Sequence, residues 1–279
     1  MLRTRALKSV AGLELAEVVR SKWLIISGGV YALIAGIFLL AGLSESSVLG
    51  FTGMGRVLFS LSHLLLLLLP LLALASTGLV INRSRDDGTF ELLFSQPLSR
   101  AEYFVGVSLV RFGALLAPLA ILFAMLAFLG WVAWGESVPW AFLGRSLVVG
   151  AALLAAFASA GLAVSVYIRN QAKALIVLLV GWLAGIALLD FGLIGLMLQW
   201  RLNAQSVFIL ASLNPVQAAR MALLSSADPT LANLGPVGFY LANRVGQPAL
   251  LALGILWPAL AGGIVWLVAR NRFVCEDLL

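Results

Sequence analysis

Six long apolar runs, separated by short charged segments, determine what this chain of 279 residues can fold into. Hydrophobic residues make up 62% of the chain and charged residues 11%, whereas soluble domains average about 45–50% and about 25%. A soluble core could not hide that much apolar surface, so lipid must surround most of the chain. An apolar run of about 18 residues or more is long enough to cross a bilayer as a helix. The predicted spans are residues 24–43, 57–81, 103–134, 140–168, 174–200 and 249–269.

The runs predict helices rather than the strands of a barrel. Barrel strands alternate apolar and polar residues over about ten positions, and the leucines at 64–69 show no alternation. Pro70, Pro118 and Pro258 lie inside the runs, which membrane helices tolerate. The predicted fold class is therefore an all-α polytopic membrane protein with six transmembrane helices, forming a single domain over residues 1–279.

The positive charges predict the orientation of the spans. With the N-terminus inside, the inner segments hold twelve Lys and Arg residues and the outer segments five, while Arg111 lies inside the third span. Lys and Arg gather on cytoplasmic loops, so both termini are predicted to face the cytoplasm. The net charge of +6 follows from this bias. It does not indicate nucleic-acid binding, because no basic patch is interleaved with aromatic residues.

Residues 1–23 are predicted to form a helix that lies on the inner surface of the membrane. Scattered charges and the lack of a compact apolar core argue against a removable signal. The apolar residues that share one side of this helix are Leu7, Val10, Ala11, Leu15, Val18 and Val19. Glu14 interrupts that side, so the amphipathic pattern is moderate, and a solvated tail is the alternative.

A polar segment, residues 82–102, lies between the second and third spans. It holds seven of the thirty charged residues, together with apolar residues that no span requires. We predict a short helix from about Thr89 to Ser95 that presents Phe90, Leu93 and Phe94 to a groove on a soluble partner. An ordinary loop that folds back on the membrane is the alternative.

The ends of this short helix are also predicted. Asp86 and Asp87 precede it, where a helix N-terminus favours negative charge. Pro97 separates it from the third span. Ser99 and Glu102 have the spacing of a capping box, so we expect them to begin the third span.

The longest segment on the predicted outer side is residues 201–248. It is apolar, but Asn214-Pro215, Asp228-Pro229 and Gly235-Pro236 interrupt it. We expect a helical lid that either lies on the membrane surface or is re-entrant. Residues 270–279 then form a cytoplasmic tail.

No arrangement of residues in the sequence points to catalysis or to a metal site. His63 is the single histidine, so any acid–base triad would need it, and we expect it to make a helix–helix hydrogen bond instead. The lone Cys275 is expected to be an incidental thiol, without a disulfide or metal role. The sequence has no Gly-x-x-x-x-Gly-Lys-Ser/Thr loop for nucleotide phosphates. If ATP drives this protein, another chain must bind it.

Asp190 is the one carboxylate deep within a predicted span. A charged group inside a membrane is costly and usually faces the bundle interior or a water-filled cavity. Asp190, with His63, is therefore a candidate for lining a transport path. A hydrogen bond between helices near the outer interface is an equally open alternative for Asp190.

The polar segment resembles the coupling-helix signature of ABC-2-type transporter permeases, which has a Gly-Thr-x-Glu-Leu-Leu core and a Pro-x-Ser-Arg exit. Residues 87–93, Asp-Gly-Thr-Phe-Glu-Leu-Leu, match the core, and residues 95–100, Ser-Gln-Pro-Leu-Ser-Arg, match the exit. Within the family, the chain is similar to the permeases of Nos transporters, which act in nitrous-oxide reductase maturation. The motifs that carry this similarity are Leu49-Gly50-Phe51-Thr52, Leu189-Asp190 and Leu213-Asn214-Pro215 with Arg220.

The resemblance implies a mechanism and a set of partners. Two copies of the permease would pair in a bacterial inner membrane, and two ATPase subunits carrying ATP and Mg²⁺ would push on the coupling helices. A periplasmic β-helical protein would sit on the outer face. The cargo would be a sulfur species for the copper–sulfur cluster of the reductase. The residues expected to dock the ATPase are Asp87, Gly88, Thr89, Phe90, Glu91, Leu92, Leu93 and Phe94.

Two alternatives stay open at this point. The first is the same fold exporting another cargo, such as a drug, a peptide or an ion. The second is a proton-coupled secondary transporter that uses Asp190 and His63. Secondary transporters often contain internal repeats, and residues 24–134 show no convincing similarity to residues 140–269.

Overall fold

In the computed structural model, the described residues are 4–21, 23–42, 53–134, 138–188, 203–227 and 241–275, with 192, 195, 199, 231 and 238 as single residues. All regular structure within these residues is helical, which confirms the predicted all-α class. The α-helices are α1 Thr4–Arg20, α2 Trp23–Gly42, α3 Gly53–Thr77, α4 Val80–Asp86, α5 Thr89–Phe94, α6 Arg100–Trp134, α7 Trp140–Tyr167, α8 Gln171–Leu183, α10 Ala204–Leu213, α11 Pro215–Ala227 and α13 Gln247–Cys275. Two π-helical turns, η1 Ala184–Leu188 and η3 Leu241–Val245, complete the described elements.

Within the described part of the chain, four helices are long and apolar enough to cross a membrane, and up to six spans result if each of two bent helix pairs counts as one. The predicted third and fourth spans agree with α6 and α7 to within three residues. The second span is longer in the structure than predicted, because α3 and α4 together run from Val57 to Asp86. Five residues of the polar segment therefore continue the membrane helix. The predicted first span corresponds to α2 and the fifth begins with α8, but most of 189–200 lies outside the described residues.

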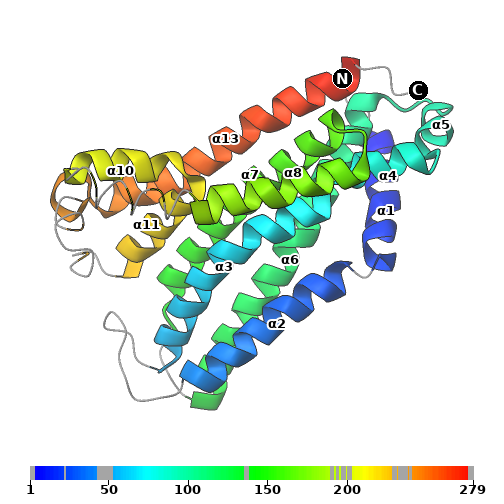
Figure 1. Cartoon of the computed structure of the whole chain (residues 1–279). Helices are drawn as coiled ribbons and strands as arrows, with labels where there is room; N and C mark the ends of the chain where they lie inside the picture. Colours follow the sequence, from blue (N-terminus) through cyan, green and yellow to red (C-terminus); the bar gives the residue numbers. More distant parts are fainter. Residues whose placement is uncertain are drawn as a thin grey trace.

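The centre of the bundle is formed by α3, α6, α7, α11 and α13 (Figure 1). In lipid, helices associate through close packing rather than through the hydrophobic effect, and small residues let their backbones approach. Gly262 of α13 shows this, because a Cβ there would lie 2.6 Å from the Cα of Ala156 in α7. Gly161 of α7 does the same against α3, because a Cβ there would lie 2.1 Å from Oγ1 of Thr77. Helix α7 is thus closely packed between α3 and α13.

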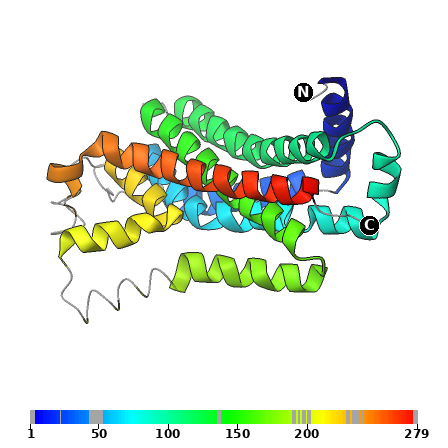
Figure 2. The ribbon, with the colours of Figure 1, turned by 90° about the horizontal axis from the view of Figure 1, so that it is seen from above.

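Helix α1 lies across one end of the bundle and packs against α6 (Figures 1 and 2). Its buried residues are Val10, Glu14 and Val18, whereas Leu15 and Val19 are exposed. Leu15 and Val19 thus lie away from the side of α1 that packs on the bundle, and their contact with the membrane surface stays a prediction. Glu14 does not interrupt the buried side; it is the centre of it. A helix turns 100° per residue, so residues four positions apart lie along one side of it. The ion pair between Glu14 and Arg111 of α6 determines which side of α1 is buried.

The opposite end of the bundle holds α10 and α11, which meet at an angle of 119° (Figure 1). Asn214 makes this turn, since its Oδ1 accepts a hydrogen bond from the backbone N–H of Val216 at 2.9 Å. Helix α11 packs on α13, α7 and α3 with most of its residues buried. A pair bent in this way is either a broken span or a re-entrant loop. The re-entrant form of the predicted lid stays a prediction, and we call α10 and α11 the re-entrant pair.

Candidate functional site

The polar segment forms three consecutive elements at the end of the bundle where both chain termini lie (Figure 1). Helix α4 ends at Asp86, Gly88 carries the turn, and α5 covers Thr89–Phe94. Gly88 has a φ of +66°, a left-handed conformation that glycine adopts without steric cost. The predicted short helix is therefore present, with its last residue one position earlier than expected.

Asp86 and Asp87 do not cap the N-terminus of α5, although the prediction placed them there to interact with it. Asp86 is the last residue of α4, and its Oδ2 accepts a hydrogen bond of 2.6 Å from the side chain of Gln171. Gly88 takes the N-cap position of α5, which has no side-chain cap. Asp87 lies between the two helices and is exposed.

The start of α6 is capped as predicted. The backbone N–H of Ser99 donates to Oε2 of Glu102 at 3.0 Å, and the backbone N–H of Glu102 donates to Oγ of Ser99 at 3.2 Å. This reciprocal pair is a capping box. It orients the chain as it leaves α5, and Arg100 then bonds the carbonyl of Val274 at 3.3 Å. The C-terminal end of α13 is thereby fastened beside the polar segment.

A cluster of aromatic rings holds α5 against the bundle. Phe90 is 4% exposed, and its ring centroid lies 5.4 Å from that of Tyr103 and 5.8 Å from that of Phe273. Edge-to-face pairs at such distances each add about 0.5–1.5 kcal/mol beyond area burial. Phe90 is therefore an internal anchor of α5. This differs from the expectation that Phe90 is presented to a partner, and the reason is the proximity of two rings that are distant in the sequence.

The outward side of α5 carries an acid next to a large apolar residue. Leu92 is 73% exposed and Glu91 is also exposed, while Leu93 and Phe94 are half-buried against the aromatic cluster. Because Phe90 fixes the inner side, Glu91 and Leu92 project from a rigid support. An exposed leucine beside a charge on a supported helix is suited to contact with a soluble protein.

Helix α1 joins this end of the bundle through a buried ion pair. Nε of Arg111 lies 2.5 Å from Oε1 of Glu14, and a second Arg111 nitrogen lies 3.1 Å from Oε1 of Glu17. Burial raises the pKa of the Glu14 carboxyl, and the charge of Arg111 opposes that rise. Arg111, which the charge count left inside the third span, is thus neutralised by α1. The sequence offered no signal for this pairing, since the partners are far apart in the chain.

Of the two transport-path candidates, only His63 is among the described residues. Nδ1 of His63 lies 3.2 Å from the carbonyl oxygen of Phe59, four residues earlier in its own helix. The expected bond from His63 to another helix is therefore replaced by a local one. Asp190 lies outside the described residues. Cys275 is exposed at the end of α13.

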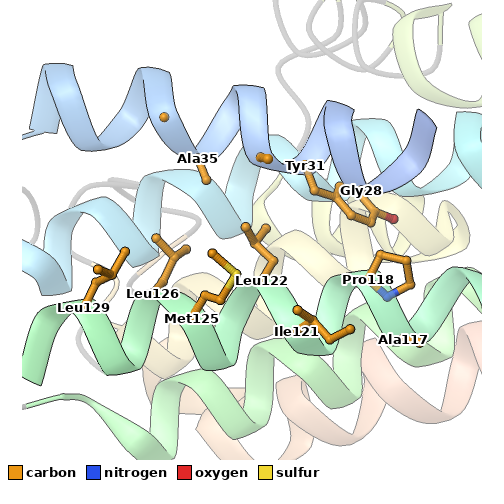
Figure 3. Close-up of a pocket in the computed structure, with 12 residues that line it drawn as sticks. Gly28, Tyr31, Ala35, Ala117, Pro118, Ile121, Leu122, Met125, Leu126 and Leu129 are labelled. Atoms are coloured by element: carbon orange, nitrogen blue, oxygen red, sulfur yellow. The ribbon is translucent and has the colours of Figure 1, made fainter. Parts of the chain in front are cut away.

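A cavity of about 470 Å³ lies between α2 and α6 (Figure 3). Small residues of α2, among them Gly28 and Gly36, form one wall, and Pro118 and Met125 belong to the α6 wall. Its lining is apolar, apart from the hydroxyl of Tyr31, which is buried and has no hydrogen-bond partner in the described structure. The cavity has the size of a small-molecule site, and its lining suits an apolar molecule better than an ion.

Comparisons with known proteins agree with the family resemblance of the polar segment. Residues 8–268 match the family model described as "ABC-2 family transporter protein". A protein of Pseudomonas aeruginosa named "Probable ABC transporter permease protein NosY" is 28% identical over 278 residues, covering 95% of this chain and 98% of the relative. A protein of Stutzerimonas stutzeri with the same name is 25% identical over 271 residues, with the same coverage of both chains. Because the family model spans most of the sequence, this chain belongs to the ABC-2 family of transporter proteins and is a permease subunit of an ABC transporter.

Proposed function

We propose that this permease docks a cytoplasmic ATPase subunit through the exposed side of α5, with Glu91 and Leu92 at the centre of the contact. The observation that carries the proposal is the division of α5 into two sides. Phe90 is buried in the aromatic cluster, whereas Leu92 is 73% exposed. The ATP and Mg²⁺ belong to the partner, and the permease supplies a rigid surface on which the partner pushes.

The membrane arrangement that we propose has six spans with both termini in the cytoplasm of a bacterial cell, in the inner membrane. The twelve-to-five distribution of Lys and Arg supports this orientation. The position of both termini and α5 at one end of the bundle is consistent with it (Figure 1). Two copies of the chain then form one transporter, with the transport path between them and Asp190 as a candidate for its lining.

The cargo that we propose is a sulfur species used to build the copper–sulfur cluster of nitrous-oxide reductase. The two relatives named NosY, which align over nearly the full length of the chain, support this assignment. A periplasmic β-helical protein would receive the cargo on the outer face. Export of a different cargo by the same machinery is the alternative, and the genes beside this one would distinguish the two.

Docking is tested by co-purification of the permease with its ATPase. Glu91→Lys and Leu92→Asp should each reduce the recovered ATPase about tenfold or more, because both alter the centre of the contact. Gln96→Lys, an exposed change just beyond α5, is the matched control and should leave recovery unchanged. Full recovery of the ATPase with both α5 variants would contradict the proposal.

Orientation is tested by labelling intact cells with an impermeant thiol reagent after Cys275→Ser removes the native thiol. A cysteine in place of Gln205, which is exposed on α10, should react, while a cysteine in place of Gln96 should react only after the cells are opened. Labelling of position 96 from outside would contradict the proposed topology.

A further inference from the structure

Helix α4 receives its N-terminal cap from a different helix. The first N–H groups of any helix lack acceptors within it, and Leu79, at the N-cap of α4, offers no side-chain oxygen. Oγ of Ser165 in α7 accepts instead, at 2.9 Å from the backbone nitrogen of Ile81 and 3.3 Å from that of Asn82. The polar segment is therefore attached to α7 at the point where α3 and α4 separate.

Two further hydrogen bonds tie α4 to the connection between α7 and α8, one to the C-cap residue of α7 and one to the first residue of α8. The side-chain amide of Asn82 donates to the carbonyl oxygen of Ile168 at 2.8 Å, and Asn82 itself is fully buried. At the end of α4, Asp86 accepts from Gln171 at 2.6 Å. Ile168 and Gln171 flank Asn170, whose Oδ1 caps α8 by accepting from the backbone of Lys173. A displacement of α4 therefore acts on the connection between α7 and α8 through Ile168, and on the first turn of α8 through Gln171.

The other attachments of α8 lie along one side of the helix, where the indole N–H of Trp182 donates to the carbonyl oxygen of Leu67 in α3 at 3.4 Å. Ala174 and Leu178 are its only fully buried residues before η1, and most of its remaining side chains are exposed. Leu178 lies against Gly78, at the break between α3 and α4, where an added Cβ would collide with it. Figure 2 shows α8 running along one side of the bundle rather than within it. A helix with so few buried residues can tilt as one body.

The far end of α8 is attached to the re-entrant pair. The π-helical turn η1 continues α8, and the carbonyl oxygen of Gly185 within it accepts a hydrogen bond of 2.7 Å from Nδ2 of Asn214. Asn214 is 4% exposed and also caps α11 through its Oδ1. Turns of π-helix inside α-helices frequently occur at functional sites. The residue that sets the angle between α10 and α11 is thus bonded to the end of α8.

We propose that α8 is a lever that carries movement of the polar segment to the re-entrant α10–α11 pair. Asn82 and Gln171 are positioning residues at its α4 end, and Asn214 is the positioning residue at its far end. The inference rests on the proposed docking of an ATPase on α5, and it adds the route by which the push reaches the opposite side of the bundle.

The test uses the complete permease–ATPase complex in lipid nanodiscs, in a Cys275→Ser background with a reporter cysteine replacing the exposed Gln205 of α10. The rate of thiol labelling is measured with and without ATP. Movement of α10 should give a rate that depends on ATP in the parent complex. Asn82→Ala and Asn214→Ala should each reduce this dependence about fivefold or more, since loss of one hydrogen bond made by a buried side chain shifts an equilibrium by roughly that factor. Gln171→Ala should reduce it in the same direction but less, because its bond to Asp86 is exposed.

Asn203→Ala is the matched control. It removes another asparagine N-cap, in which Oδ1 accepts from Ser206 at the start of α10, without touching α8. Its response to ATP should equal that of the parent. Because Gln171 makes its bond at the surface, its replacement keeps the test valid even if Asn82→Ala or Asn214→Ala fails to fold.

The outcomes separate the lever from the docking. All variants should retain the ATPase and hydrolyse ATP, because α5 is unchanged, and loss of dependence with hydrolysis intact supports the lever. If the three variants respond to ATP as the parent does, or if the parent shows no ATP-dependent labelling, the lever is refuted. Failure of the ATPase to bind the parent complex would instead refute the proposed docking surface.

Discussion

Replacement of Arg111 by leucine should release α1 from the bundle. Arg111 is 6% exposed and Glu14 3% exposed, and their closest atoms are 2.5 Å apart. Removing one partner of a buried ion pair costs about 3–5 kcal/mol, because the other charge stays buried without compensation. The lower value corresponds to roughly a hundredfold increase in the population in which α1 is detached.

The assay is thiol labelling of a cysteine at position 18, again in the Cys275→Ser background. Val18 is a fully buried residue of α1, so its cysteine replacement reacts only when α1 leaves the bundle. Arg111→Leu should increase the labelling rate by about two orders of magnitude. Glu17→Gln is the control, since the Glu17 side chain is 52% exposed and exposed pairs contribute about 1 kcal/mol or less.

Two additional measurements, a pH series and a double variant, test whether the uncompensated charge of Glu14 causes the detachment. Burial already holds the pKa of Glu14 above its ordinary value, and Arg111 opposes this shift, so removal of Arg111 should raise the pKa further. A carboxyl with a raised folded-state pKa loses stability as pH rises through that pKa. The ratio of the variant's labelling rate to the parent's at the same pH should therefore be smaller at acid pH than at alkaline pH, and this ratio removes the pH dependence of the thiol itself. Combining Arg111→Leu with Glu14→Leu should restore most of the protection, because an apolar pair replaces the buried ions.

The reasoning is refuted if Arg111→Leu leaves the cysteine at position 18 as protected as it is in the parent at every pH. Equal damage from Glu17→Gln would also contradict it, since that result would mean that burial does not determine the cost.

Three smaller changes test other contacts. Gly161→Ala should lower the melting temperature of the complex, because its Cβ would lie 2.1 Å from Oγ1 of Thr77, and overpacking typically costs about 1–3 kcal/mol; an unchanged melting temperature would contradict the close packing of α3 and α7. Tyr31→Phe should leave the melting temperature within error, since the hydroxyl it removes has no partner in the described structure; clear destabilisation would reveal a bond there. Ser99→Ala should cost about 1 kcal/mol by removing the acceptor of the Glu102 N–H, measurable by denaturation of the complex, and no loss would show that the capping box is not stabilising.

The sequence predicts most accurately where apolar length and a local cap act together. The third span begins at Arg100 because Ser99 and Glu102 cap it, and all of these residues are adjacent in the chain. The prediction ended the second span too early, at residue 81, because Asn82 is a polar residue that usually marks the end of an apolar run. Its side-chain N–H donates to the carbonyl oxygen of Ile168, which follows a different span, so the helix can continue through it.

Burial of a charged or aromatic side chain was harder to predict, because it depends on partners elsewhere in the chain. Glu14 reads as a break in an apolar face until Arg111 is placed beside it. From the local sequence Phe90 is predicted to be exposed, but in the structure it is buried against Phe273. Local patterns identified the helix and its motif correctly, but which side of the helix faces outward is a property of the assembled bundle.

The contact between Phe90 and Phe273 has a consequence for biogenesis. Phe90 is synthesised early, whereas Phe273 belongs to the final turn of α13. During synthesis, N-terminal elements fold before later ones exist, so α5 has to wait for the last helix before its support is complete. A truncated or stalled permease would thus display an unsupported α5. An ATPase that recognises only the supported helix would then assemble with finished chains and leave incomplete ones alone.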